Sequence, residues 1–213
     1  MPLDSFGWGW GWRRGGGPWD ALMHRAARDE ALTLNTEAAQ DLATASLQQP
    51  QGQPLQQSST ADADLLVSCN SGGGCRWHPP QLWIGLGCER GSSLPLLQQA
   101  VERSLSASQL APEAVAGLAS LELKGDEPAL LALAAERQWP LKLVSAEQLK
   151  MQPVPTPSEV VAAEVGCPSV AEAAALVAAG HGAVLRQAKT IYKEDGHGAV
   201  TVAIAEAAMP WAP

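Results

Sequence analysis

The stretch LWIGLGCERGSS at residues 82–93 contains the residues best suited to hold an anion. It reads as an apolar strand, a glycine-rich turn and the start of a helix. Backbone N–H groups at a helix start, together with a guanidinium group, can bind a carboxylate or a phosphate. The alternative is a plain tight turn in which Glu89 and Arg90 face water. The residues of the candidate anion site are Gly87, Arg90, Gly91 and Ser92.

The glycine spacing in this stretch does not match a nucleotide-binding loop. Gly85, Gly87 and Gly91 form G-x-G-x-x-x-G, one residue longer than the dinucleotide fingerprint. That fingerprint also needs an acidic residue about 20 positions further on, whereas Glu122 and Asp126 come more than 30 positions after Gly87. The sequence has no G-K-[ST] motif either. We therefore expect no nucleotide and no other cofactor.

The stretch LKGDEP at residues 123–128 is a second candidate site. Lys124, Asp126 and Glu127 follow an expected strand, at the edge where α/β sheets bind their ligands. A lysine beside two carboxylates can tune a general base or hold a substrate acid. If the chain catalyses a hydrolysis, we predict that Glu127 or Asp126 activates the water. The alternative is that one acid caps the next helix while Lys124 faces solvent.

Three capping-box patterns account for two glutamates that look catalytic by residue type. A Ser or Thr followed three positions later by Glu or Gln closes the first turn of a helix. We therefore interpret Glu159 and Glu172 as helix caps. The predicted boxes are Ser145 with Gln148, Thr156 with Glu159, and Ser169 with Glu172.

The remaining polar residues give weaker signals. Arg186, Lys189 and Lys193 could contact an anion, although charges on a late pair of strands usually face solvent. The cysteines and the histidine in C-x5-C-x2-H-x9-C lack the short-looped pairs that zinc sites prefer, so we predict no metal site. Those residues are Cys69, Cys75, His78 and Cys88.

Alternating strands and helices position both candidate sites. Capped and amphipathic stretches between and after the apolar runs predict helices. The order β-α-β-α-β-α-α-β-β over residues 81–208 predicts an α/β fold with helices on both faces of a mixed sheet. The predicted strands are residues 82–87, 117–123, 140–145, 183–192 and 199–205.

Residues 1–65 have a different character. The segments FGWGWGWRRGGGPW and SLQQPQGQPLQQSST are of low complexity, and we expect neither to build a core. We therefore predict a largely disordered N-terminal region and linker, with at most a short helix between residues 20 and 45. Residues 66–80 are expected to form an irregular connector, and residues 209–213 a tail.

Charge and composition exclude several classes of partner. The net charge of −8 disfavours binding to nucleic acid or to an anionic membrane. No apolar run approaches the roughly 18 residues of a membrane span, and we identify no signal peptide. The four cysteines show no paired spacing, so we expect free thiols and a cytoplasmic location.

Four segments together resemble a known family. They are GLGCERGSS, LELKGDEPALLALA, VPTPSEVVAAEVGCPSVAEAAAL and AVTVAIA. In this order and at this spacing they are similar to the C-terminal domain of the cobalamin-biosynthesis protein CbiG, which is shared with the stand-alone protein CobE. RWHPPQLWIG also resembles the linker before this domain in cyanobacterial versions.

The resemblance implies a three-layer α/β/α fold and a role in the corrin-ring pathway. Full-length CbiG is a hydrolase that opens the δ-lactone of cobalt-precorrin-5A and releases acetaldehyde. The upstream residues of this chain match neither of CbiG's preceding domains. This favours the alternative of a non-catalytic, CobE-like module that binds a tetrapyrrole intermediate or another pathway enzyme. Arg90, Lys124 and Lys189 are then the expected contacts for corrinoid carboxylates.

Overall fold

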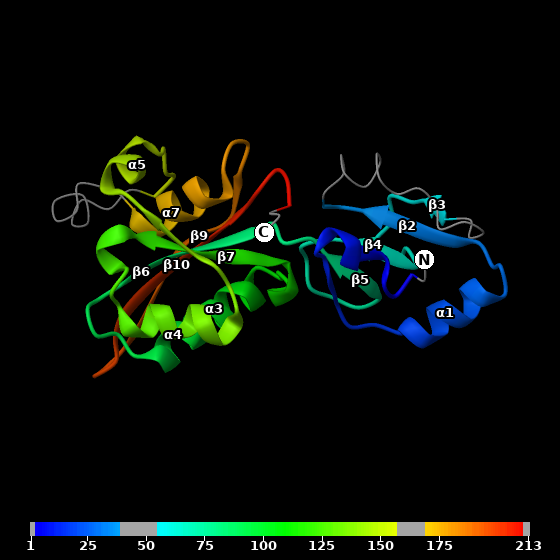
Figure 1. Ribbon diagram of the computed structural model, residues 1–213, viewed down its shortest axis with the longest axis horizontal. Coiled ribbons are helices and arrows are strands. Elements are labelled where there is room, and N and C mark those ends of the chain that lie inside the picture. Colours follow the sequence, from blue (N-terminus) through cyan, green and yellow to red (C-terminus); the bar gives the residue numbers. More distant parts are fainter. Residues whose placement is uncertain (1–2, 39–54, 157–168, 211–213) are drawn as a thin grey trace. The chain divides into compact units, whose positions relative to one another are not determined.

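The computed structural model describes residues 3–38, 55–156 and 169–210, which form two units (Figure 1). The C-terminal unit comprises Gln81–Ser108 and Val115–Ala208. The N-terminal unit comprises Met1–Pro80, Gln109–Ala114 and Met209–Pro213. Within the N-terminal unit, the Ala111 N–H donates to the Cys69 carbonyl at 2.9 Å, so a segment from the middle of the chain completes this unit.

The sheet of the C-terminal unit has the order β8-β7-β6-β10-β9. β6, β7 and β8 are parallel, whereas β10 runs antiparallel to both β6 and β9. The sheet is therefore mixed, as predicted. The strands are β6 (Leu82–Cys88), β7 (Val115–Leu121), β8 (Leu141–Val144), β9 (Val184–Glu194) and β10 (Gly198–Glu206).

Helices cover both faces of this sheet. α3 (Leu94–Ala107) and α4 (Pro128–Arg137) lie on one face, and α5 (Ala146–Met151) and α7 (Val170–Ala179) lie on the other (Figure 1). A short 3₁₀ helix, η3 (Glu122–Lys124), links β7 to α4. The predicted three-layer α/β/α fold is confirmed for this unit.

Close packing of α7 on β6 depends on small residues. A Cβ atom at Gly85 would lie 1.9 Å from the carbonyl oxygen of Ala171, so only glycine fits there. The face of α7 that meets the sheet is rich in alanine, which lets the helix backbone approach the strand. The buried alanines of α7 are Ala171, Ala173, Ala174, Ala175 and Ala178.

Local capping is partly as predicted. Ser145 and Gln148 form the expected capping box at α5, and Ser93 caps α3 by accepting the Leu96 N–H at 3.3 Å. The box predicted at Ser169 is wrong, because no side-chain hydrogen bond caps α7. The box predicted at Thr156 extends into residues outside the described part of the chain.

The N-terminal unit forms a sheet of its own, with the order β1-β5-β4-β2-β3. The strands from β2 to β5 are parallel and β1 is antiparallel to β5. The 3₁₀ helix η1 (Phe6–Trp10) and the helix α1 (Trp19–Ala27) precede β2. The strands are β1 (Arg13–Arg14), β2 (Leu32–Thr36), β3 (Leu55–Gln57), β4 (Leu65–Val67) and β5 (Cys75–His78).

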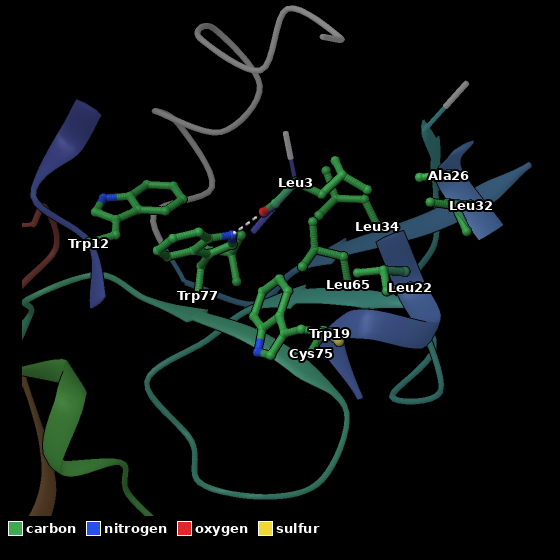
Figure 2. Close-up of a cluster of buried hydrophobic side chains, with 11 residues drawn as sticks. Leu3, Trp12, Trp19, Leu22, Ala26, Leu32, Leu34, Leu65, Cys75 and Trp77 are labelled. Atoms are coloured by element: carbon green, nitrogen blue, oxygen red, sulfur yellow. Dashed lines mark hydrogen bonds between the residues drawn. The ribbon is translucent and has the colours of Figure 1, made fainter. Parts of the chain in front are cut away.

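The tryptophan-rich segment builds a core around Trp77, contrary to the sequence prediction (Figure 2). The ring of Trp19 packs edge-on to that of Trp77 with centroids 5.8 Å apart. A Cβ atom at Gly7 would lie 2.5 Å from Trp77, so the glycine at this position lets an indole reach the backbone. The indole N–H of Trp77 donates to the Leu3 carbonyl at 3.0 Å.

Two parts of the N-terminal prediction are therefore corrected. The described residues within 1–65 contribute to a packed sheet, because their indole and leucine side chains bury one another. The expected irregular connector at 66–80 contains most of β4 and all of β5. Residues 39–54 of the predicted linker lie outside the described part of the chain.

Candidate functional site

The predicted anion loop follows β6 at the carboxyl edge of the parallel strands, where open α/β sheets bind ligands. Gly91 has a φ of +75°, a conformation that favours glycine, and it turns the chain from the strand into α3. Gly87 is not part of this turn, because it lies within β6 opposite Thr201.

Three backbone donors at this turn are engaged by the chain itself. The Gly91 N–H donates to Glu127 Oε1 at 2.7 Å. The N–H groups of Ser92 and Ser93 donate to the carbonyls of Glu89 and His197, at 3.3 and 3.0 Å. An internal carboxylate thus lies where the sequence predicted an external anion.

Arg90 reaches across to the segment between β7 and α4. Its Nη1 donates to Asp126 Oδ1 at 2.6 Å, and its Nη2 donates to the Leu123 carbonyl at 2.7 Å. Its side chain is 59% exposed. The structure therefore brings together the cations and acids of the two predicted stretches. We call Arg90, Lys124, Asp126 and Glu127 the carboxyl-edge cluster.

Glu127 is the buried member of the carboxyl-edge cluster. Its side chain is 2% exposed, and Oε2 lies 3.6 Å from Arg90 Nη1 and 3.8 Å from Lys124 Nζ. Among the described residues, no group hydrogen-bonds to this oxygen. Glu127 holds the N-cap position of α4, but its side chain does not cap the helix. The carboxylate instead joins the start of α4 to the β6–α3 turn.

The charges of the cluster affect one another. The hydrogen bond from Arg90 lowers the pKa of Asp126, and the same bond raises the pKa of Arg90. Burial raises the pKa of the neighbouring Cys88 thiol, and Lys124 only partly opposes this effect. Cys88 is therefore a protonated thiol near neutral pH, which argues against a nucleophile.

Ser92 has a structural role in the turn. Its side chain is buried, and Oγ is within hydrogen-bond distance of the Glu89 and Ala199 carbonyls, at 2.9 and 3.2 Å. A Cβ atom at Gly198 would lie 2.7 Å from this oxygen. The hydroxyl therefore ties the turn to β10.

Lys189 lies away from the turn, on β9. Its strand has an irregularity opposite Ala203, which in turn pairs with Gly85 within β6. The Lys189 N–H donates to Glu172 Oε1 at 3.0 Å. The backbone pairing thus sets Lys189 within the sheet, apart from the carboxyl-edge cluster.

Glu172 is a polar residue whose setting the sequence did not indicate. It is fully buried in α7, and Oε1 accepts hydrogen bonds from Thr156 Oγ1 and from the Lys189 N–H. Its Oε2 has no hydrogen-bond partner among the described residues. The sequence indicated only a capping box with Ser169, and nothing in it pointed to these contacts.

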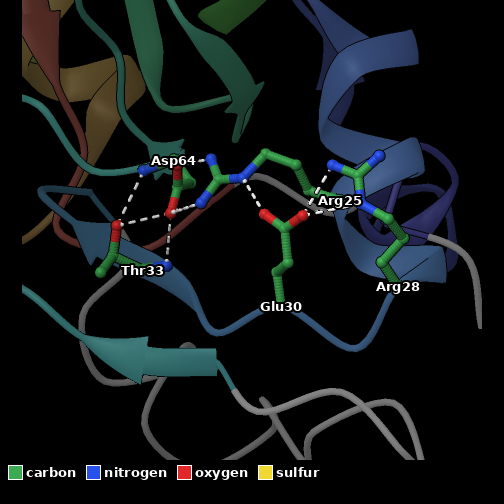
Figure 3. A network of polar contacts seen from close by, with 5 residues as sticks. All are labelled: Arg25, Arg28, Glu30, Thr33 and Asp64. Carbon is green, nitrogen blue, oxygen red and sulfur yellow. Dashed lines mark hydrogen bonds and ion pairs between the residues drawn. The ribbon is translucent and has the colours of Figure 1, made fainter.

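A second cluster of acids and arginines lies in the N-terminal unit (Figure 3). Asp64, which directly precedes β4, accepts hydrogen bonds from the N–H and Oγ1 of Thr33, at 2.9 and 3.0 Å. It also accepts hydrogen bonds from Arg25 of α1. We call Arg25, Arg28, Glu30, Thr33 and Asp64 the amino-edge network, because it lies at the amino ends of β2 and β4.

Two further results concern metal and membrane binding. The described residues contain no group of three or more His, Cys, Asp or Glu side chains that could hold a metal ion. None of the described helices combines the length and the apolar character that crossing a membrane requires. Cys75 and Cys88 are free thiols.

Comparison with known proteins gives consistent matches for the C-terminal unit. Residues 82–205 match the family described as cobalamin synthesis G C-terminus. The chain is 30% identical over 131 residues to the cobalt-precorrin-5A hydrolase of Priestia megaterium, which covers 62% of this chain and 34% of the hydrolase. It is 41% identical over 106 residues to the protein CobE of Sinorhizobium sp, covering 49% of this chain and 69% of CobE.

A solved structure agrees with these matches. The crystal structure of CobE, a protein from the cobalamin (vitamin B12) biosynthetic pathway, shares 35% identity with this chain. It has a TM-score of 0.52 and covers 59% of this chain and 89% of that one. The chain spans only about a third of the Priestia hydrolase, at 34%.

Proposed function

Because the chain belongs to the cobalamin synthesis G C-terminus family, we propose that it binds a carboxylate-rich corrinoid intermediate of cobalamin biosynthesis at the carboxyl-edge cluster. The family relationship agrees with the resemblance of the four sequence segments. The proposal includes a cytoplasmic location, which suits the free thiols of Cys75 and Cys88.

The observation that carries this proposal is an exposed arginine beside exposed apolar side chains. Arg90 is 59% exposed, and the segment that it contacts carries Leu123, which is 64% exposed. Leu143 of β8 is 46% exposed and lies against Gly125 of the same segment. A corrinoid has an apolar ring edged with acetate and propionate groups, so it needs both kinds of contact.

A binding role fits the described residues better than catalysis by this chain alone. Binding needs only the cations and apolar side chains already present. This chain covers 34% of the length of the hydrolase relative and 69% of the length of CobE. We therefore favour a CobE-like module that holds the intermediate, with other enzymes of the pathway as its protein partners.

A second candidate function, lactone hydrolysis, rests on Glu127. Its Oε2 is buried, lacks a hydrogen-bond partner among the described residues and lies within 4 Å of two cations. A carboxylate in that setting can accept a proton from water during attack on an ester. Asp126 is less suited, because it is 73% exposed and bonded to Arg90.

Calorimetric titration with cobyrinic acid, a corrin with free carboxylates, tests the binding proposal. We expect Arg90→Ala to weaken binding about tenfold, since a charge-assisted hydrogen bond is lost. Arg103→Ala, which removes an exposed arginine of α3, is the matched control and should leave the affinity unchanged. Cobinamide, with amides in place of carboxylates, should bind more weakly. If cobyrinic acid does not bind the wild type, the proposal fails.

The hydrolysis candidate needs its own assay. Release of acetaldehyde from cobalt-precorrin-5A by the purified chain, lost in Glu127→Gln, would support it. Binding of cobyrinic acid without acetaldehyde release would leave only the binding role.

A further inference from the structure

We propose that Asp126 occupies, in the ligand-free protein, the place on Arg90 that a ligand carboxylate takes, and that it thereby determines which ligands bind. This inference rests on the proposed binding of corrinoid carboxylates at Arg90. It assigns a different role to each of the two acids that follow Gly125.

The contacts of Arg90 show which groups a ligand carboxylate competes with. Nη1 donates to Asp126 Oδ1 at 2.6 Å, and Nη2 donates to the Leu123 carbonyl at 2.7 Å. Both outer nitrogens are thus engaged by one short segment. Asp126 has the same functional group as the ligand, so a carboxylate that approaches Nη1 of Arg90 competes with Asp126 for this contact.

Exposure makes Asp126 the exchangeable acid. Its side chain is 73% exposed, and water can solvate both it and Arg90 when they separate. Pairs of this kind contribute little to stability because solvent screens them. Asp126 also lies in the turn between η3 and α4, outside both elements. Its carboxylate can therefore leave Arg90 without unfolding a helix or a strand.

Glu127 is the fixed acid by the same criteria. It is 2% exposed, and its Oε1 accepts the Gly91 N–H at 2.7 Å. Lys124, which is 18% exposed, lies 3.8 Å from its other oxygen. Moving this buried carboxylate would break its hydrogen bond with the Gly91 N–H and take it away from two cations, Arg90 and Lys124. A ligand therefore meets Arg90 with Glu127 still in place.

The replacement of Asp126 by a ligand carboxylate at Arg90 discriminates between small and large ligands. A small carboxylic acid that replaces Asp126 exchanges one ion pair for an equivalent one and gains little. A ligand that also covers Leu123 and Leu143, which are 64% and 46% exposed, gains apolar contact in addition. Asp126 thus excludes small carboxylates and admits a large amphipathic one.

The test is a double-mutant cycle with cobyrinic acid and with succinate, both measured by calorimetry. We expect Asp126→Asn to bind cobyrinic acid about two- to fivefold more tightly, and to bind succinate measurably where the wild type does not. In the Arg90→Ala background the same substitution should give no gain. Glu122→Gln, an exposed acid of the same segment, controls for net charge, and circular dichroism confirms folding of each variant.

Each alternative outcome is distinct. If Arg90→Ala weakens binding but Asp126→Asn does not strengthen it, this inference fails while the proposed function stands. An equal gain in Glu122→Gln or in the Arg90→Ala background would show a general charge effect and overturn it. No binding of cobyrinic acid to the wild type would overturn both. Should Asp126→Asn misfold, Asp126→Ser carries the same test.

Discussion

The carboxyl-edge cluster and the amino-edge network contain the same kinds of residue but differ in their role. Each joins an arginine to an aspartate and a glutamate. In the amino-edge network, Asp64 is 20% exposed and is bonded by Arg25 and by two donors of Thr33. In the carboxyl-edge cluster, Glu127 is 2% exposed and keeps one oxygen without a hydrogen-bond partner among the described residues.

The difference shows how to separate a structural cluster from a candidate site. Arg25 is 38% exposed and Arg90 is 59% exposed. The network around Arg25 lies at the amino ends of its strands, whereas Arg90 follows the carboxyl end of β6, the edge at which parallel sheets bind ligands. An accessible arginine does not separate the two clusters, because Arg28 of the amino-edge network is 64% exposed. What separates them is the edge of the sheet and the buried Glu127 oxygen, which has no hydrogen-bond partner among the described residues. Stability and affinity should therefore respond differently to changes in each.

The largest expected effect is on stability and comes from Glu127→Ala. Removing this acid leaves the Gly91 N–H without its acceptor and Lys124 without its nearby charge, so we expect a loss of about 3 kcal/mol in the free energy of unfolding. Urea denaturation of the C-terminal unit measures it. Glu127→Gln, which keeps an acceptor, should lose less, and Glu122→Ala should lose almost nothing. Equal losses in all three variants would contradict the structural role.

A smaller loss is expected from Asp64→Ala in the other cluster. Thr33 and Arg25 lose their shared acceptor, but the site is close enough to solvent for water to replace it in part. We expect about 2 kcal/mol of destabilisation, with Asp62→Ala as the exposed control. The affinity for cobyrinic acid, measured on folded protein, should not change. A matching loss of affinity would remove the distinction between the two clusters.

The smallest effect concerns pH. Burial tends to raise the pKa of Asp64, but the hydrogen bonds from Arg25 and Thr33 outweigh it and hold the pKa below the ordinary value of 3.8. The stabilisation is therefore complete above that value and is lost as the pH falls through the lower, folded-state pKa. Urea midpoints of the N-terminal unit should fall more steeply below about pH 4 in the wild type than in Asp64→Asn. Parallel curves would contradict this assignment.

The C-terminal fold could be predicted from the sequence because its signals are local. Buried strand runs, glycine turns and capped helices alternate, and their order defines the layers. The same reasoning drew attention to Arg90, Lys124, Asp126 and Glu127, since each follows a parallel strand. The sequence could not predict which of these side chains contact one another. Those contacts depend on which of two neighbouring loops each side chain reaches.

The N-terminal core was missed because its contacts are not local. Gly7 is useful only because Trp77 packs against it, and the two are far apart in the sequence. An interpretation based on composition treats alternating tryptophan and glycine as a low-complexity segment and therefore predicts no core. Glu172 was misjudged for a related reason. Its hydrogen bonds go to Thr156 and Lys189, outside its own helix, so a local capping rule could not find them.

The interleaved course of the chain has a consequence during synthesis. The N-terminal unit includes Gln109–Ala114, which leave the ribosome only after β6 and α3 have been made. The hydrogen bond from the Ala111 N–H to the Cys69 carbonyl can therefore form only after Ala111 has been synthesised. The N-terminal unit is thus still incomplete when its first 80 residues have been translated. A nascent chain stalled shortly after Pro80 would present an unfinished unit to chaperones and proteases.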